Sequence, residues 1–282
     1  MKEIAIKAIY AILGLNAGSG ITYVDDKVYV ISDNANVLYE YQIHNQQTIY
    51  HSLDNNPINH QLNKAEKYDL EAITKVDNQL FIIGSGSQAN RSTAFNYNLN
   101  TQKTDTLSLQ YLYETLQDFS EIPEKELNIE GVVKYKDDYI FLNRGNGPSQ
   151  KNTLFVVQGK NLVDEFNTFY YEFDLPKLNN VPTGFSDAVV VNNHMFFIAT
   201  AEDTSNVIDD GEIKGSLIGA IDLKKMKLLF TEVISNNQKF EGITLKSIDK
   251  KNVEFLLVED NDDANVTESK IYSLTAKLKR KP

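Results

Sequence analysis

Four acidic residues recur at nearly even spacing along the chain, and carboxylates in such a series could bind a cation or move a proton. They are Glu71, Glu130, Asp187 and Glu241, and Ser19 takes the corresponding place in the first copy of the pattern. Successive positions are 52, 59, 57 and 54 residues apart. Repeats of this length are often arranged around an axis, which brings equivalent residues together. The spacing therefore predicts an acidic ring.

A ring of carboxylates requires electrostatic compensation. Like charges held close together raise one another's pKa unless a cation or hydrogen-bond donors stabilise them. Ca²⁺ accepts six to eight oxygen ligands in loose geometry. We therefore predict Ca²⁺ as a cofactor, with Glu71, Glu130, Asp187 and Glu241 as its ligands. In the alternative, the acidic side chains accept hydrogen bonds from backbone amides of the neighbouring repeat, and no metal is needed.

The residues around each anchor indicate β-strands. A short apolar run, a tight polar turn and a second apolar run follow one another, as in "GVVKYKDDYIFLN". Further strand-like segments give about four strands per repeat, which is typical of a propeller. We predict an all-β fold, a five-bladed β-propeller of four-stranded blades, with six blades as the alternative. It would form one domain over residues 1–282, with repeats starting near residues 19, 71, 130, 187 and 241.

The two ends of the chain are expected to complete one blade. The last repeat lacks an outer strand, whereas residues 3–13 read as a strand that precedes the first repeat. Pairing the two would close the ring and remove an exposed sheet edge. One connection also reads differently from the strands, because residues 110–119 predict a short helix.

Polar loops follow the second strand of each repeat and should gather at one face of the propeller. Arg144 takes the place that Asp33 holds in the first repeat, so it would pair with Glu130 or bind an anionic group. The predicted ligand-binding residues are Asp33, Asn34, Ser85, Arg91, Arg144, Asn146, Asp203, Glu259 and Asp260. The same loops contain Ser87, Glu202 and Asp262.

Composition excludes several classes of function. The chain has 282 residues, 28 Lys and Arg against 39 Asp and Glu, and a net charge of −11, which would repel nucleic acid and an anionic membrane surface. No cysteine is present, which excludes disulfides and thiolate nucleophiles. None of the four histidines falls at an anchor position of the repeats, which disfavours a serine hydrolase and a zinc site. No apolar run is long enough for membrane insertion. The absence of a clear signal peptide favours the cytoplasm, with export as the alternative.

The inner motifs also resemble a known group of proteins. "DLEAIT", "IEGVV" and "FEGIT", followed by "IGSGS", "LNRGN" and "VEDND", resemble the phytase-like and SdiA-regulated β-propellers, and in particular an uncharacterised bacterial branch common in Bacteroidetes. This resemblance implies a propeller with Ca²⁺ at the acidic ring and an esterase-like or phosphoesterase-like activity. The chain departs from the pattern where Ser19 and Asp187 replace Glu. Only Arg91 and Arg144 could form a basic wall for phosphate.

Two functions follow from these residues. The first is a binding propeller that holds a small molecule or a loop of a partner protein at the mouth of its channel. The second is a metal-assisted hydrolase, acting on phosphoesters, esters or lactones, in which Glu130 or Glu241 orients water as the catalytic residue. The scarcity of cationic residues and the absence of histidine from the anchor positions favour binding.

Overall fold

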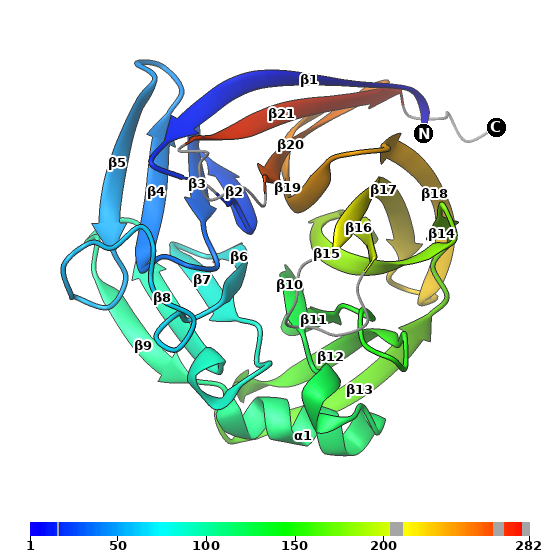
Figure 1. The fold of residues 1–282 in the computed structure, drawn as a ribbon, viewed down its shortest axis with the longest axis horizontal. Coiled ribbons are helices and arrows are strands. Elements are labelled where there is room, and N and C mark those ends of the chain that lie inside the picture. Colours follow the sequence, from blue (N-terminus) through cyan, green and yellow to red (C-terminus); the bar gives the residue numbers. More distant parts are fainter. Residues whose placement is uncertain (16, 204–210, 262–267, 278–282) are drawn as a thin grey trace.

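The computed structural model describes residues 1–15, 17–203, 211–261 and 268–277. Five antiparallel sheets surround a central axis, and each follows the last in chain order (Figure 1). Every innermost strand contacts the innermost strands of both neighbouring sheets. The predicted five-bladed propeller is confirmed, and the six-bladed alternative is wrong.

The first three blades have four strands each. Blade 1 consists of β2 (Gly20–Val24), β3 (Lys27–Ile31), β4 (Val37–Gln42) and β5 (Gln47–Ser52). Blade 2 consists of β6 (Leu70–Val76), β7 (Gln79–Gly84), β8 (Thr93–Asn98) and β9 (Thr104–Ser108). Blade 3 consists of β10 (Ile129–Tyr135), β11 (Asp138–Asn143), β12 (Asn152–Asn161) and β13 (Glu165–Phe173).

The last two blades each depart from this plan. Blade 4 consists of β15 (Val181–Val191), β16 (His194–Asp203), β17 (Glu212–Asp222) and β18 (Lys227–Ser235), and the two-residue strand β14 (Lys177–Leu178) pairs with the start of β15. Blade 5 consists of β19 (Lys239–Ile248), β20 (Asn252–Asp260), β21 (Glu268–Lys277) and the N-terminal β1 (Lys2–Leu13). The antiparallel pairing of β1 with β21 confirms the predicted closure of the ring.

Short turns join the two inner strands of most blades. Asp25 and Asp26 between β2 and β3 both adopt positive φ, at 49° and 58°. Asp77 and Asn192 do the same in the corresponding turns of blades 2 and 4. Asn and Asp tolerate this left-handed conformation better than most residues, and two-residue hairpins require it. These turns send each second strand back toward one face of the propeller.

The hydrophobic core lies between the blades, in five clusters that each join two neighbouring sheets. Between blades 4 and 5, for example, Phe196 lies against Phe255 with ring centroids 5.1 Å apart. The predicted helix is present as α1 (Gln110–Ser120), and it covers the cluster between blades 2 and 3 with Leu112 and Leu116. Of two 3₁₀ turns, η1 (Ala89–Arg91) lies between β7 and β8, and η2 (Glu124–Glu126) follows α1 in the connection to β10. No helix among the described residues is long and apolar enough to cross a membrane.

Candidate functional site in the central channel

Three of the predicted acidic residues occupy one equivalent place in their blades. Glu71, Glu130 and Glu241 each lie where the pairing of the innermost strand with the next strand shifts by one residue, as in a β-bulge. Bulges commonly re-aim a side chain beside a functional site. In the first blade the same place belongs to Ser19, whose hydroxyl accepts a hydrogen bond from the backbone amide of Asp33 at 2.9 Å.

The fourth blade requires a correction to the sequence alignment. Its register shift falls between Phe185 and Asp187, so Ser186 is the residue equivalent to Glu71. Asp187 takes the next place along the strand. Its Oδ2 accepts a hydrogen bond from the backbone amide of Ile243 in blade 5 at 2.8 Å. Asp187 therefore links two blades in the way that the metal-free alternative expected.

The assignment of equivalent residues also shifts by one position at the end of β20. Phe240 pairs with Glu259 as Ile129 pairs with Asn143, so Asp260, and not Glu259, is the residue equivalent to Arg144. The side chain of Glu259 accepts a hydrogen bond from the hydroxyl of Tyr272 on β21 instead. Asp260 contacts the channel cation Lys239 at 2.8 Å.

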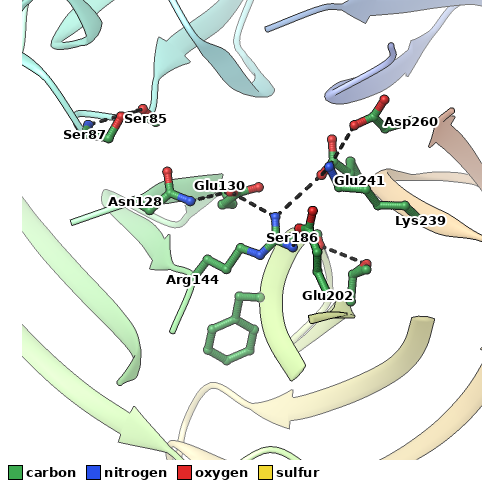
Figure 2. A network of polar contacts seen from close by, with 12 residues as sticks. Ser85, Ser87, Asn128, Glu130, Arg144, Ser186, Glu202, Lys239, Glu241 and Asp260 are labelled. Atoms are coloured by element: carbon green, nitrogen blue, oxygen red, sulfur yellow. Dashed lines mark hydrogen bonds and ion pairs between the residues drawn. The ribbon is translucent and has the colours of Figure 1, made fainter. Parts of the chain in front are cut away.

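Arg144 is the centre of a buried ion-pair network (Figure 2). Its Nη2 lies 2.7 Å from Glu202 Oε2, and its Nη1 lies 3.3 Å from Glu130 Oε1 and 3.6 Å from Glu241 Oε1. The guanidinium thereby joins blades 3, 4 and 5. Burial raises the pKa of Glu202, but Arg144, Lys239 and the backbone amide of Gly211 together outweigh it and hold the pKa below its usual range. The prediction that Arg144 pairs with Glu130 agrees with this geometry.

Lys239 is a second channel cation, which was not predicted from the sequence. Its Nζ lies 3.1 Å from Glu241 Oε1 and 2.8 Å from Asp260 Oδ2. The sequence did contain a signal for this residue. The position two places before the anchor is polar in three repeats, where it holds Asp69, Asn128 and Lys239. Residues two apart in a strand share a face. Asn128 donates to Glu130 Oε1 at 2.6 Å, as this rule predicts.

A second network lies at the start of blade 2. Lys67 Nζ bridges Asp33 Oδ2 at 2.6 Å and Asp69 Oδ1 at 2.7 Å. Arg91 Nη1 contacts the other Asp69 oxygen at 2.8 Å and also the Ser87 hydroxyl. The hydroxyl of Ser85 donates to the same Asp69 oxygen. Asp33, Ser85 and Arg91 are thus brought together, while Lys67 and Asp69 had not been predicted.

Other predicted residues lie apart from these networks. Asp203 is exposed at the end of β16, and Asn34 accepts a hydrogen bond from the nearby Ser32 hydroxyl at 3.0 Å. Asn146 lies in the loop after Arg144, and its Oδ1 is buried. Asp262 lies outside the described residues.

The carboxylates of the channel are electrostatically strained. Burial, with smaller contributions from Glu130 and other nearby carboxylates, raises the pKa of Glu71 well above its usual range. Burial also raises the pKa of Glu241 well above that range, although Lys239 opposes it. The pKa of Glu130 is raised by burial and partly restored by Arg144. Arg144 and Lys239 therefore compensate this negative charge only in part.

A Ca²⁺ ion at the acidic ring would require several oxygen ligands around one point. Among the described residues, no group of three or more Asp, Glu or His side chains is arranged to hold a metal ion. Arg144 and Lys239 contact Glu130 and Glu241, two of the four predicted ligands. As placed, these carboxylates do not form a finished Ca²⁺ cage, so Ca²⁺ at the ring stays a prediction.

Comparison with known proteins supports the fold. Residues 14–276 match a Family of unknown function (DUF6929). No curated protein matches the sequence. Among solved structures, the chain is similar to the glutaminyl cyclase of Myxococcus xanthus, with a TM-score of 0.55, 10% identity and 97% of each chain covered. It is also similar to the Malassezia sympodialis allergen Mala s 1, with a TM-score of 0.56, 11% identity and 93% and 94% of the two chains covered.

A third structure has the same general likeness. A luciferin-regenerating enzyme has a TM-score of 0.52 and 10% identity, and the match covers 97% of this chain and 96% of that one. At such low identity the likeness shows the propeller fold alone, because one fold carries many activities.

Proposed function

The chain belongs to this Family of unknown function (DUF6929), and we propose that it is a binding propeller whose acidic channel takes a positively charged ligand. The observation that carries the proposal is an excess of negative charge around the axis. Among the described residues of the two networks and the ring, eight carboxylates face four cations. The carboxylates are Asp33, Asp69, Glu71, Glu130, Asp187, Glu202, Glu241 and Asp260, and the cations are Lys67, Arg91, Arg144 and Lys239.

Glu71 is the carboxylate that most needs a cation. The main influences on its pKa, burial and four neighbouring carboxylates, all raise it. Its side chain is half-buried, whereas Glu130 and Glu241 are buried. Part of Glu71 is therefore open to a ligand. Binding a positive charge there would offset repulsion that otherwise favours protonation.

Ca²⁺ is the leading candidate for the ligand. It binds carboxylate and carbonyl oxygens in flexible geometry, and water molecules complete its shell where protein ligands are few. The resemblance of the inner-strand motifs to phytase-like and SdiA-regulated propellers supports the same choice. An ammonium group, from a small amine or a lysine on a partner's loop, carries the same sign of charge and is the alternative ligand.

The experiment combines elemental analysis with thermal unfolding. Purified protein is expected to contain stoichiometric calcium, and chelation should lower its Tm, because a ligand at about 100 times its Kd stabilises by roughly 2.7 kcal/mol. Glu71→Gln should abolish the calcium-dependent shift, while Glu121→Gln, at an exposed residue after α1, should preserve it. If neither calcium nor propylammonium changes the Tm of the wild type, the channel does not bind cations and the proposal is wrong.

A metal-assisted hydrolase is the second candidate. The raised pKa of Glu130 and of Glu241, due to burial, is a property that general acids and bases often have. Bound Ca²⁺ would polarise a phosphoryl or ester oxygen, and one of these carboxylates would orient water. We expect Glu130→Gln and Glu241→Gln to reduce turnover in a screen of phosphoesters, esters and lactones. Unchanged turnover in both variants would refute this role.

A further inference from the structure

A pocket of about 220 Å³ opens beside the channel network, between blades 3 and 4. The loop from β11 to β12 supplies Asn146 and Pro148, and blade 4 supplies Pro182, Gly184 and Glu202. Arg144 forms the wall toward the channel. At about 30 Å³ for each water, the volume corresponds to roughly seven water molecules, which suits a small organic molecule.

Two buried polar atoms that belong to residues lining this pocket have no hydrogen-bond partner among the described residues. They are Arg144 Nε, a donor, and Asn146 Oδ1, an acceptor. Arg144 as a whole is 4% exposed. Leaving such groups unpaired is costly, and native proteins rarely do so without a ligand, an ion or a water. The pocket lining therefore includes one unpaired donor and one unpaired acceptor.

The pocket wall is held in place before any ligand arrives. Asn152 Oδ1 accepts from the backbone amides of Gly145 and Phe185, each at 3.0 Å, and its Nδ2 donates to Thr183 O at 2.8 Å. One side chain thus fixes the blade 3 loop against blade 4. A preformed wall reduces the entropy lost on binding.

Glycine at position 184 is part of the same construction. A Cβ at Gly184 would lie 2.4 Å from Arg144 Cγ, far inside contact distance. Any other residue there would push the Arg144 side chain away from its present position. Gly184 therefore keeps the arginine at the pocket wall.

The charges around the pocket favour an uncharged ligand. The Arg144 guanidinium already contacts three carboxylates, and both oxygens of Glu202 have partners, Arg144 Nη2 and the amide of Gly211. An anion would lie beside Glu202, while a cation would lie beside Arg144 and find no unpaired carboxylate oxygen among the lining residues. A neutral group that can both donate and accept a hydrogen bond meets neither penalty.

We infer that this pocket binds a small uncharged molecule that can both donate and accept hydrogen bonds, such as a diol or a carboxamide. The acceptor receives the Arg144 Nε hydrogen bond, and the donor bonds to Asn146 Oδ1. This site is separate from the cation site at Glu71, and neither requires the other.

The test compares neutral ligands with charged ones. Saturation-transfer NMR and calorimetry on the full chain would compare propionamide with propionate and propylammonium, and would include myo-inositol as the diol. We expect the two neutral probes to bind and Asn146→Leu to weaken them about five- to tenfold, the effect of one hydrogen bond. Gly184→Ala should weaken them as well, because it displaces Arg144.

Controls separate this site from the channel. Asn45→Leu, in an exposed turn of blade 1, should leave binding of the neutral probes unchanged, and Asn146→Leu should retain the calcium response of the wild type. The inference is overturned if neither neutral probe binds with a Kd below about 10 mM, if propionate binds better than propionamide, or if a folded Asn146→Leu binds as well as the wild type. Loss of the calcium response alone would count against the channel proposal only.

Discussion

Replacing Arg144 with Met should destabilise the propeller strongly, because the guanidinium is the only described cation that contacts Glu130 or Glu202 in the ion pairs of the channel. Methionine keeps much of the alkyl chain but removes the charge. Both carboxylates would then remain buried in blades 3 and 4 without their positive partner. The blades would be joined at the axis by fewer polar contacts.

The magnitude follows from the distances. Two unit charges about 4 Å apart interact by about 4 kcal/mol at an effective dielectric constant near 20. The ion pairs of Arg144 with Glu202 and Glu130 are shorter, at 2.7 and 3.3 Å. Desolvation offsets much of this, but removing one partner of a buried pair typically costs about 3–5 kcal/mol. For a chain of this size, each kcal/mol changes Tm by about 2–4 °C, so we expect a decrease of about 6–20 °C.

The loss should also depend on pH in a defined direction. Burial raises the pKa of Glu130 and Glu241 in the folded protein, and removing Arg144 would raise both further. When the pKa of a carboxyl is higher in the folded protein than in the unfolded chain, raising the pH ionises the carboxyl in the unfolded chain first. Stability therefore decreases as the pH rises above the pKa of the unfolded chain. The difference in Tm between wild type and Arg144→Met should therefore be larger at pH 8 than at pH 5.

Thermal unfolding followed by circular dichroism at both pH values would measure this difference. Lys277→Met is the matched control, because Lys277 forms an ion pair with Glu3 at an exposed site, where such pairs contribute at most about 1 kcal/mol. Adding Glu130→Gln to Arg144→Met should restore part of the loss. A decrease in Tm no larger than that of Lys277→Met, or one that is equal at the two pH values, would refute the electrostatic account of the channel.

Two further predictions concern the acidic ring and the closure of the propeller. Glu71→Gln should raise the Tm of calcium-free protein at pH 8, and raise it less at pH 5, because it removes a carboxyl whose pKa is raised by burial and nearby carboxylates. The gain in stability should be on the order of 1 kcal/mol. A lower Tm at pH 8 would contradict this prediction. Ile12→Ala, in the closing strand β1, should cost about 2–5 kcal/mol by denaturant unfolding, because Ile12 is fully buried in the cluster between blades 5 and 1; a loss below 1 kcal/mol would show that β1 contributes little to closure.

The blade count and the closing strand could be predicted from sequence because they depend on local signals. Paired apolar runs, a polar turn and a fixed period specify the inner strands of each repeat. The N-terminal strand could be assigned to blade 5 because the last repeat lacked its own outer strand. The helix over Gln110–Ser120 followed from a break in the same strand pattern.

The equivalent site residues of the blades were predicted less accurately, because a bulge shifts the pairing of two strands by one residue. In blade 4, "FSDA" offers two polar residues, and spacing alone favoured Asp187 over Ser186. Only the register, in which Asp187 pairs with Ile198, identifies Ser186 as the equivalent of the glutamates. The pairing of Lys239 with Asp260 depends on an insertion between β19 and β20 that repeat spacing does not resolve.

The channel chemistry follows from two positions in each inner strand, the anchor and the residue two places before it. In blade 3 these are Glu130 and Asn128, and in blade 5 they are Glu241 and Lys239, so one blade presents an acid with an amide and the other an acid with a base. In blade 2 both positions are acidic, Asp69 and Glu71, and the cations Lys67 and Arg91 contact Asp69. Blade 2 therefore leaves Glu71 as the acidic side chain with the least compensation. For this reason a cation should bind on the blade 2 side of the axis, and the uncharged ligand on the side of blades 3 and 4.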